Sequence, residues 1–329
     1  MNILITGSCG FIGYHLTKYF LKKRFTVFGI DTLNNYYDVD LKKERLKLLK
    51  ISKNFHYYNI DISNKKKLDH FFSTKKIDAI INLAAYAGVQ YSKENPDIYF
   101  NTNEVGFYNI LENAKKNKIK KIIFASSSSV IGNSKNLISD ENNNTDEPIS
   151  LYAATKKNNE ILAHYYAYNY KIQIIGVRFF TAYGEYGRPD LSIYKFSSQI
   201  LNNKKLTLNN KGDHYRDFTY IDDVVKCLFK LFRLKEFNEI DKNKNRYFQI
   251  FNIGGGRKIK ITFLVDLLEK LFKKKASRMY GPLIKGDIIY SKASTLKLFR
   301  NIKYKPNTKI EVGLKYFVRW FTNHKKSNK

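Results

Sequence analysis

Short apolar segments alternate with helical segments through the first half of the chain, and this alternation constrains the fold more than any other feature. The segments expected to form strands span residues 2–6, 25–30, 55–60, 78–83, 120–125 and 172–178. The segments expected to form helices between them include residues 11–23, 64–74, 97–117 and 150–169. Strands separated by helices in this way form parallel sheets that are covered on both faces. The sequence therefore predicts an α/β fold built on a doubly wound parallel sheet.

A glycine-rich turn lies between the first expected strand and the first expected helix, in the segment Thr6-Gly-Ser-Cys-Gly-Phe-Ile-Gly13. Its three glycines permit a tight turn, close approach of a diphosphate and close packing of the helix on the strand. The next strand ends in Asp31, whose carboxylate can accept hydrogen bonds from an adenosine ribose and would repel an additional phosphate there. The pattern predicts an NAD site and disfavours NADP. A structural turn followed by a helix-capping aspartate is the alternative.

A further contact to this cofactor is expected at the end of the third strand. Asp61 and Ile62 stand there, and the aspartate could reach the adenine. Capping of the helix that follows is a comparable role for Asp61.

Tyr152 and Lys156 are four residues apart in an expected helix, so they share one face of it. A tyrosine hydroxyl titrates near pH ~10, and a neighbouring ammonium or the positive charge of an oxidised nicotinamide would favour its phenolate. Such a phenolate is a base that can accept a proton from an alcohol. Ser127 ends an apolar strand and could supply a hydroxyl to the same alcohol. A tyrosine–lysine pair on an ordinary helix surface is the alternative, and only the surrounding motifs decide against it.

The composition limits the class of protein. The formal net charge is +30, but arginine supplies only 11 of the 59 basic residues, whereas base-edge readers and phosphate clamps rely on arginine. Without a nucleic-acid-binding motif, a nucleic-acid partner is disfavoured. The two cysteines, Cys9 and Cys227, indicate no disulfide framework, and no apolar run approaches the ~20 residues that span a bilayer. We expect a soluble cytoplasmic protein without a metal site.

The glycine turn, the serine-rich strand end and the tyrosine–lysine pair occur in an order that resembles the extended short-chain dehydrogenases/reductases, the NAD-dependent epimerase/dehydratase family. The resemblance runs nearly end to end and includes Asn82-Leu-Ala-Ala85, Asn103, Arg216-Asp-Phe-Thr-Tyr-Ile-Asp-Asp223 and Phe251-Asn-Ile-Gly254. Within this superfamily the chain is most similar to the UDP-glucuronate 4-epimerases. Three stretches carry that closer similarity: Asp31-Thr-Leu-Asn-Asn-Tyr-Tyr-Asp-Val-Asp-Leu41, Ser150-Leu-Tyr-Ala-Ala-Thr-Lys-Lys157 and Arg178-Phe-Phe-Thr-Ala-Tyr-Gly184 leading into Gly187-Arg-Pro-Asp190.

The resemblance implies a Rossmann-type fold and assigns roles to individual residues. The implied catalytic residues are Ser127, Tyr152 and Lys156. The implied NAD-binding residues are Gly7, Gly10, Phe11, Ile12, Gly13, Asp31, Asp61, Ile62, Leu83, Ala84, Ala85 and Asn103, together with Tyr152 and Lys156. The implied UDP-sugar contacts are Ser128, Ser129, Thr181, Arg188 and Arg216, with the two arginines meeting the diphosphate. A solvated surface position is the alternative for either arginine, and a polar helix surface for Asn103.

The resemblance also implies the reaction. Tyr152 removes the proton from the sugar 4-hydroxyl while NAD takes up hydride, and the resulting 4-keto sugar turns and is reduced on its opposite face. Related dehydratases and decarboxylases carry an acid in the serine segment, which here holds only serines from Ser126 to Ser129. Serine hydroxyls and Thr181 are suited to hold a sugar carboxylate out of alignment with the ketone, which would suppress loss of carbon dioxide. UDP-glucuronate is therefore the expected substrate and UDP-galacturonate the product.

Beyond residue 180 the pattern changes to turn-rich segments with isolated helices, expected at about 192–202, 221–233, 262–274 and 308–322. We expect residues 1–180, with returning segments at about 214–256, to form the NAD-binding domain. Residues 181–213 and 257–329 are expected to form a smaller C-terminal α/β substrate-binding lobe. The expected helices at 97–117 and 150–169 resemble those that pair across the family's dimer, so a homodimer is expected.

Four positions depart from the family pattern: Gln90, Ile131, Tyr215 and Ser294 replace the usual arginine, tyrosine, basic residue and aspartate. None belongs to the catalytic trio, although loss of the arginine weakens any inference about how the sugar region is held. Two other functions therefore remain open: a neutral-sugar 4-epimerase acting on UDP-glucose or UDP-N-acetylglucosamine, and a non-catalytic binding protein on the same fold.

Overall fold

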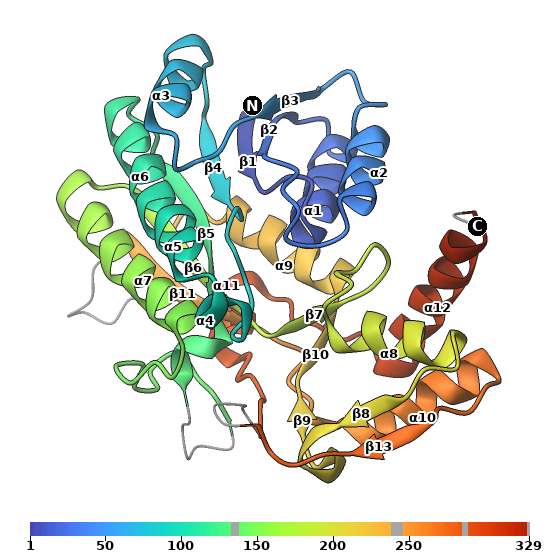
Figure 1. The fold of residues 1–329 in the computed structure, drawn as a ribbon. Coiled ribbons are helices and arrows are strands. Elements are labelled where there is room, and N and C mark those ends of the chain that lie inside the picture. The colour runs from blue at the N-terminus through green and yellow to red at the C-terminus, as the bar shows by residue number, and fades with distance from the viewer. Residues whose placement is uncertain (133–137, 238–245, 285–288, 328–329) are drawn as a thin grey trace.

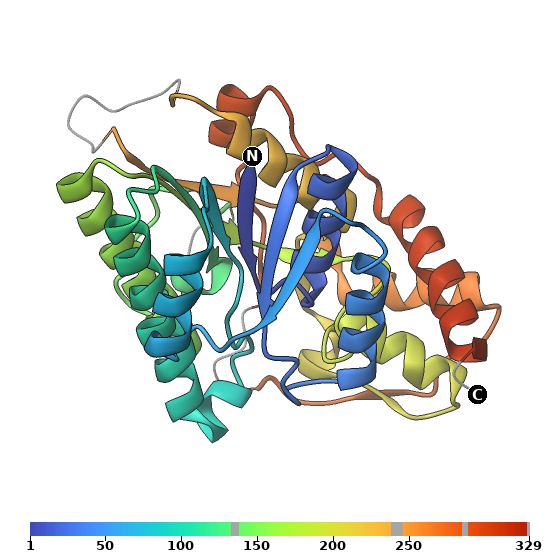
Figure 2. The ribbon, with the colours of Figure 1, turned by 90° about the horizontal axis from the view of Figure 1, so that it is seen from above.

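A computed structural model describes residues 1–132, 138–237, 246–284 and 289–327 of the chain. Its centre is a seven-stranded sheet in the order β11-β6-β5-β4-β1-β2-β3, with parallel pairing between all neighbours (Figure 1). The order reverses direction at β1, and helices lie on both faces (Figure 2). The predicted α/β, Rossmann-type sheet is confirmed. Its strands are β1 (Asn2–Thr6), β2 (Thr26–Asp31), β3 (Phe55–Asn59), β4 (Ala79–Asn82), β5 (Lys121–Ser127), β6 (Gln173–Phe179) and β11 (Phe248–Ile253).

Alternation of side chains along the strands explains why both faces of the sheet are covered. Ile3 and Ile5 of β1 belong to the core under one helical layer, whereas Leu4 belongs to the core under the other. The first layer contains α1 (Phe11–Lys22), α2 (Val39–Leu49) and α9 (Ile221–Arg233). The second contains α3 (Lys65–Thr74), α6 (Gly106–Lys116) and α7 (Leu151–Tyr170).

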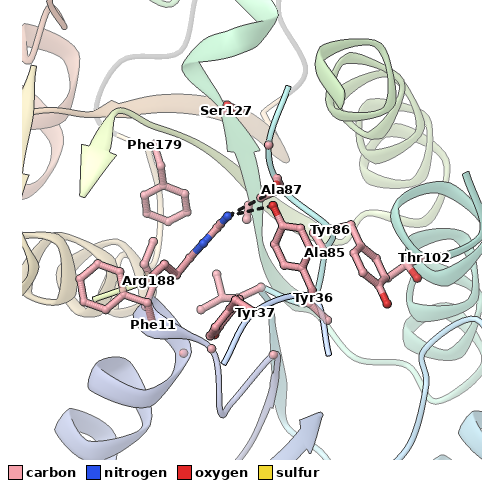
Figure 3. A pocket seen from close by; sticks show the side chains of 18 of the residues that line it. Phe11, Tyr36, Tyr37, Ala85, Tyr86, Ala87, Thr102, Ser127, Phe179 and Arg188 are labelled. Atoms are coloured by element: carbon pink, nitrogen blue, oxygen red, sulfur yellow. Dashed lines mark hydrogen bonds between the residues drawn. The ribbon is translucent and has the colours of Figure 1, made fainter. Parts of the chain in front are cut away.

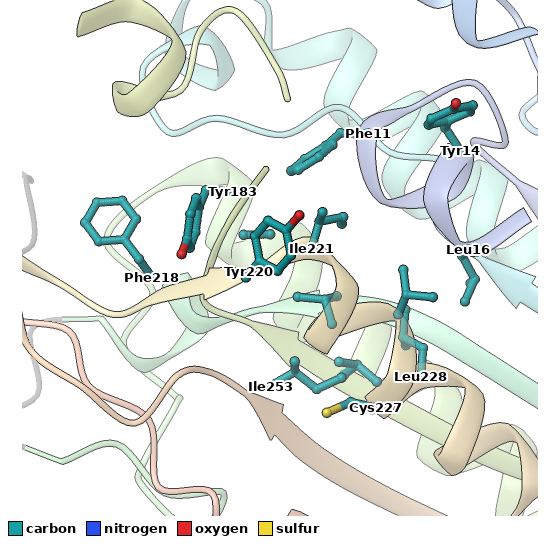
Figure 4. Packing of buried hydrophobic residues seen from close by; sticks show 14 of the residues in the cluster. Phe11, Tyr14, Leu16, Tyr183, Phe218, Tyr220, Ile221, Cys227, Leu228 and Ile253 are labelled. Carbon is teal, nitrogen blue, oxygen red and sulfur yellow. The ribbon is translucent and has the colours of Figure 1, made fainter. Parts of the chain in front are cut away.

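The first layer continues without a break into the packing beneath the rest of the molecule. Figure 4 shows Phe11 and Leu16 of α1 on the side of that helix toward Ile221 and Leu228 of α9, and all four belong to one apolar cluster. Because the same cluster reaches into the C-terminal half, the position of α1, and with it the glycine turn, depends on packing from distant parts of the chain.

The C-terminal half adds short strands and helices beside the main sheet. β7 (Thr181–Tyr183) pairs with β10 (Phe218–Tyr220), β9 (Tyr215–Arg216) with β12 (Ile259–Lys260), and β8 (Leu206–Leu208) with β13 (Arg278–Tyr280). The helices are α8 (Ser192–Leu201), α10 (Ile261–Phe272), α11 (Leu296–Ile302) and α12 (Ile310–Ser327). The boundaries drawn between an NAD-binding domain and a substrate-binding lobe stay a prediction.

Two stretches differ from the expected elements. The expected helix at 97–117 is interrupted: after α4 (Tyr91–Glu94) come α5 (Pro96–Tyr99), a π-helical segment over Phe100–Val105, and α6. Helix α2 was not expected, although Asp38 caps it by accepting hydrogen bonds from the N–H groups of Asp40 and Leu41. Its amphipathic pattern is weak because two of its inward residues are charged, Lys42 and Arg45. None of the described helices combines the length and apolar character required to cross a bilayer.

Candidate active site

A cavity of about 390 Å³ opens at the carboxyl ends of the central strands, where ligands of doubly wound sheets bind. It brings together residues that are far apart in the sequence, from Gly7 to Leu191. The predicted site residues that line it are Gly7, Gly10, Phe11, Ile12, Gly13, Asp31, Asp61, Ile62, Leu83, Ala84, Ala85, Ser127, Ser128, Ser129, Tyr152, Lys156, Thr181 and Arg188.

The glycine turn has the geometry that requires glycine. Gly7 has a φ of +67°, and a Cβ at this position would lie 2.8 Å from the backbone nitrogen of Ala84. A Cβ on Gly13 would lie only 2.0 Å from the carbonyl oxygen of Gly7, so α1 packs against the turn at a distance that only glycine permits. The N-terminus of α1 and its free N–H groups therefore face the cavity, where a diphosphate can bind.

The two aspartates have distinct surroundings. Asp31 accepts hydrogen bonds from the N–H groups of Cys9 (3.0 Å) and Leu33 (3.1 Å), and each carboxylate oxygen keeps a lone pair for a ribose hydroxyl. Asp61 accepts hydrogen bonds from the N–H and hydroxyl of Ser63 at 2.9 and 2.8 Å. The cap of α3 is Asn64, so the alternative role of Asp61 as that cap is wrong.

The three residues predicted to be catalytic meet at the end of β5. Lys156 of α7 donates to the carbonyl oxygen of Ala125 at 2.9 Å, which holds the helix against the strand that carries Ser127. The Ser127 hydroxyl donates to that of Ser129 at 3.1 Å and accepts from the Ser129 N–H at 3.1 Å. The ring of Tyr152 packs edge-on against that of Tyr99 at 6.2 Å. Strand and helix thus present two hydroxyls and an ammonium to one part of the cavity.

The electrostatics of the trio differ from the expectation that Lys156 keeps the phenolate available. Burial raises the pKa of Tyr152, and a hydrogen bond with Ser127 and the positive charge of Arg188 oppose this rise without overcoming it. Burial also lowers the pKa of Lys156 to about 7, so the protein alone only partly retains its charge at neutral pH. Positive charge from a bound ligand would oppose the effect of burial and favour the phenolate of Tyr152.

Arg188 extends into the cavity from the loop before α8 (Figure 3). Its guanidinium donates to both carboxylate oxygens of Asp190, at 3.0 and 2.5 Å. One terminal nitrogen also donates to the hydroxyl of Tyr36 at 3.1 Å and to the carbonyl oxygen of Ala87 at 3.4 Å. Arg188 therefore connects the two sides of the cavity and can present part of its fork to an anion between them.

Two predicted contacts do not line this cavity. Arg216 lies on β9, where it donates to the carbonyl oxygens of Tyr215 (3.1 Å) and Ile289 (3.4 Å). Asn103 is buried in the π-helical segment; it accepts from the Tyr86 N–H and donates to the Tyr86 carbonyl oxygen and to Thr155 Oγ1. In this structure Asn103 holds the loop that forms one cavity wall against α7.

Several residues of the cavity wall were not predicted from the sequence. Tyr36, Tyr37 and Lys42 line the cavity, as does Tyr86. Lys42 donates to the carbonyl and side-chain oxygens of Asn34, both at 2.6 Å. The tyrosine pair stands inside a stretch that carried the closer family resemblance, and that was the available signal for its role.

A buried ion pair behind the serine segment was not predicted from the sequence either. Glu160 of α7 forms two hydrogen bonds with Arg178 of β6, at 2.9 and 2.8 Å, and accepts a third from the hydroxyl of Ser126 at 2.6 Å. Glu160 does not line the cavity. The carboxylate that reaches the serine segment is therefore paired with Arg178 and lies outside the cavity lining.

The departures from the family pattern lie around the site. Gln90 is exposed at the start of α4, and Ile131 packs in a small apolar cluster with Val130, Phe180 and Ala293. Tyr215 stacks on Tyr290 at 5.2 Å with Lys258 above both rings, and the Ser294 N–H donates to the Ser139 carbonyl oxygen.

The cavity fits a dinucleotide. The turn at Gly7 to Gly13 leaves space that a Cβ would fill, Asp31 stands at the end of the next strand, and the tyrosine–lysine pair lies further along the same cavity. These residues would hold the diphosphate, the adenosine ribose and the nicotinamide end of NAD, respectively.

Comparisons with known proteins agree with this geometry. The family model described as "NAD dependent epimerase/dehydratase family" matches residues 3–254. The UDP-glucuronate 4-epimerase of Thermodesulfobacterium geofontis is 40% identical over 318 residues, covering 96% of this chain and 95% of that protein.

Two solved structures are similar over almost their whole length. The UDP-glucuronic acid 4-epimerase of Bacillus cereus, crystallised with UDP-glucuronic acid and NAD, superposes with a TM-score of 0.90 at 31% identity, covering 98% of this chain and 100% of that chain. The UDP-glucose 4-epimerase of Thermotoga maritima, crystallised with UDP-glucose, gives a TM-score of 0.86 at 27% identity, covering 98% of this chain and 99% of that chain. The chain belongs to the NAD dependent epimerase/dehydratase family.

Proposed function

We propose that this protein is an NAD-dependent 4-epimerase that interconverts UDP-glucuronate and UDP-galacturonate through a 4-keto sugar. The observation that carries the proposal is the position of Tyr152 and Lys156 opposite a strand end that offers the sugar only hydroxyl groups. The similarity to UDP-glucuronate 4-epimerases over 96% of the chain supports the same substrate.

The residues of the cavity divide the reaction between them. Tyr152 accepts the proton of the sugar 4-hydroxyl, and Ser127 donates a hydrogen bond to the same oxygen. Bound NAD supplies the acceptor, and afterwards the donor, of the hydrogen on carbon 4. In the return step Tyr152 gives its proton back to the 4-oxygen after the sugar ring has turned. The anchoring of Lys156 on Ala125 keeps the tyrosine and Ser127 at a fixed separation during both steps.

In this proposal the carboxylate of the sugar contacts several hydroxyl groups that line the cavity. Ser128, Ser129 and Thr181 line the cavity beside Ser127, and Arg188 supplies positive charge nearby. A 4-keto uronic acid is a β-keto acid, which loses carbon dioxide when its carboxylate aligns with the ketone. Hydrogen bonds from these hydroxyls would hold the carboxylate out of that alignment. No such requirement exists for a neutral sugar.

The substrate assignment is tested by rates on UDP-glucuronate and UDP-glucose measured side by side. We expect kcat/KM for UDP-glucuronate to be about 100-fold higher or more, because a site with hydrogen-bond donors for a carboxylate discriminates against a substrate without one. Thr181→Ala should reduce this preference and release some 4-keto pentose. A preference for UDP-glucose, or for UDP-N-acetylglucosamine, would establish the neutral-sugar epimerase instead.

We also propose that the protein is a homodimer that associates through the outer faces of α6, α7 and the π-helical segment. α6 and α7 lie side by side at one surface of the molecule (Figures 1 and 2). Their outward side chains are large and exposed, namely Phe100, Tyr108, Ile161, Tyr165 and Tyr168. Ile161, Tyr165 and Tyr168 follow a helical i, i+4, i+7 spacing on the side of α7 opposite Tyr152, so a second copy can cover this stripe without closing the cavity.

Sedimentation of the wild-type protein should give the mass of a dimer, and Ile161→Lys should shift it to a monomer because the new charge would be buried without a partner. Phe263→Lys is the matched control, since Phe263 is also an exposed apolar residue but lies on α10. A dimer that survives Ile161→Lys and dissociates with Phe263→Lys would refute the proposed interface.

The setting of the protein is part of the proposal. Both cysteines, Cys9 and Cys227, are free and buried, which supports a reducing compartment such as the cytoplasm. The product would serve the synthesis of a uronate-containing polysaccharide. We also propose that residues 1–180 and about 214–256 form the NAD-binding domain. Residues 181–213 and 257–329 then form the smaller substrate-binding lobe.

A further inference from the structure

Arg45 is a fully buried cation that connects three segments around the cavity without lining it. One terminal nitrogen donates to the carbonyl oxygen of Cys9 at 2.9 Å and to the hydroxyl of Tyr37 at 2.8 Å. The other donates to the carbonyl oxygen of Tyr186 at 2.6 Å. Helix α2 thus ties the glycine turn, the tyrosine pair and the loop that carries Arg188 to a single guanidinium.

The charge of Arg45 has no carboxylate partner among the described residues, and its Nε has no hydrogen-bond partner there. A buried cation is costly unless an anion or several good hydrogen bonds compensate it. Its accepting partners are two carbonyl oxygens and one hydroxyl. The remaining positive charge lies directly behind the turn where the diphosphate of the dinucleotide would bind, so the cofactor can supply the missing negative charge.

The bond to Cys9 also determines which groups the glycine turn presents. The Cys9 N–H donates to Asp31 and its carbonyl oxygen accepts from Arg45, so side chains hold both polar groups of this residue. Cys9 is fully buried and does not line the cavity, unlike Gly10, Phe11 and Ile12. If this peptide rotated, its carbonyl oxygen would face a diphosphate and repel it. Arg45 therefore keeps the turn in a form that offers N–H groups to the anion.

The bond to Tyr186 acts on the sugar side. Tyr186 stands two residues before Arg188, and Tyr37 is adjacent to Tyr36, which accepts a hydrogen bond from Arg188 (Figure 3). The ring of Tyr186 packs against that of Trp320 at 4.9 Å. Trp320 is the single tryptophan of the chain, so its fluorescence reports the position of this loop.

We propose that Arg45 is a positioning residue that couples cofactor retention to the placement of the Arg188 loop. In this role one nitrogen of its rigid guanidinium holds the Cys9 carbonyl oxygen away from the diphosphate. The other nitrogen holds the Tyr186 carbonyl oxygen, and with it the loop that carries Arg188. The inference about sugar binding rests on the proposed function, whereas the inference about NAD rests on the glycine turn alone.

The test compares Arg45→Met and Arg45→Lys with two control variants of the same helix. First, the NAD that acid releases from each purified protein is measured per chain. Second, NAD is titrated into protein from which it has been removed, and the fluorescence emission of Trp320 is recorded. We expect wild type to retain NAD and its Trp320 emission to change on titration. Arg45→Met should weaken NAD binding by about tenfold or more, as expected for loss of a charge-assisted contact, and should abolish the emission change. Arg45→Lys should keep part of the retention but not the loop response, because an ammonium lacks the planar fork.

The controls separate positioning from general stability. Lys47→Met removes an exposed positive charge of α2, and Leu46→Ala removes buried apolar volume from α2 without touching either carbonyl. Both should keep wild-type NAD affinity and loop response, although Leu46→Ala should melt at a lower temperature. KM for UDP-glucuronate should rise about tenfold in Arg45→Met at saturating NAD, with kcat within about threefold of wild type.

Wild-type NAD affinity and an intact Trp320 response in Arg45→Met would overturn the proposal. The proposal would also fail if Leu46→Ala, with a melting temperature similar to that of Arg45→Met, lost NAD affinity and the Trp320 response to the same extent. If UDP-glucuronate is not turned over by wild type, the proposed function fails, while the NAD and fluorescence measurements still decide the role of Arg45.

Discussion

Tyr152→Phe is expected to lower kcat by about 10²- to 10⁴-fold, the range observed when a general acid–base group is removed. The substitution deletes the one hydroxyl that can take the proton from the sugar 4-oxygen and return it. Ser127 can still donate a hydrogen bond to that oxygen, but a serine in a hydrogen bond with Ser129 has no charge support for acting as a base. The NAD content of the purified protein should remain unchanged, because the glycine turn and Asp31 are untouched.

The effect should be visible as initial rates of epimer formation at saturating UDP-glucuronate, with NAD content determined on the same samples. Tyr165→Phe is the matched control, since it removes a tyrosine hydroxyl from the exposed side of the same helix. A Tyr152→Phe protein that retains more than about a tenth of the wild-type rate would exclude Tyr152 as the base. Complete loss of NAD from this variant would show that the tyrosine acts through cofactor retention.

The raised pKa of Tyr152 adds a pH dependence to this account. Burial favours the neutral phenol, so the active, deprotonated form gains population as pH rises. We therefore expect kcat to increase from acidic to mildly alkaline pH. It should not decline between about pH 6 and pH 8.

Arg178→Met is expected to lower the free energy of unfolding by about 3–5 kcal/mol, because it leaves the Glu160 carboxylate buried without its counter-charge. Both side chains are almost fully buried, with 4% and 7% of their surfaces exposed. Their two hydrogen bonds join α7 to β6, and the Ser126 hydroxyl extends the network to β5. The pair therefore sets how the helix that carries Tyr152 and Lys156 lies on the strand that carries Ser127.

Urea unfolding of wild type, Arg178→Met and the double variant Arg178→Met/Glu160→Leu measures this effect. The double variant should recover most of the lost stability, because replacing both charges removes the uncompensated ion. Asp40→Asn is the control, because Asp40 pairs with Lys43 at the surface, where the two side chains are 90% and 64% exposed. Surface pairs of this kind contribute at most about 1 kcal/mol to the free energy of unfolding. Equal stability of Arg178→Met and wild type would show that the pair does not anchor α7.

The parts of the molecule that sequence reasoning predicted well depend on local patterns. Apolar strands alternate with helices along the chain, and the glycine, aspartate, serine and tyrosine motifs stand beside these elements, so the sheet and much of the cavity lining could be predicted. The glycine turn is local in the same sense, because Gly13 packs against the carbonyl oxygen of Gly7, which is close to it in the sequence.

The parts that could not be predicted depend on contacts between distant segments. Helix α2 buries Lys42 and Arg45, and a helix whose inward face is charged carries no apolar periodicity. The pairing of Glu160 with Arg178 becomes visible only when α7 lies on β6. Asn103 was predicted from a family motif to contact the cofactor, and this stays a prediction; its hydrogen bonds with the backbone of Tyr86 become visible only in the folded chain.

The charge states of Tyr152 and Lys156 could not be predicted from the sequence either. Spacing places Tyr152 and Lys156 on one face of a helix, but only the folded surroundings determine how much burial opposes each charged form. Burial is the largest cause of the pKa shift of both residues, and it opposes the charged form of each.

The most direct test of the account is incubation of the purified protein with UDP-glucuronate and no added NAD, followed by chromatographic separation of the two epimers. We expect UDP-galacturonate to form until the mixture matches the one reached from UDP-galacturonate, because the cofactor is regenerated in each cycle and stays in the cavity. If neither epimer forms from the other, with NAD shown to be present in the protein and with more NAD added, the account is contradicted.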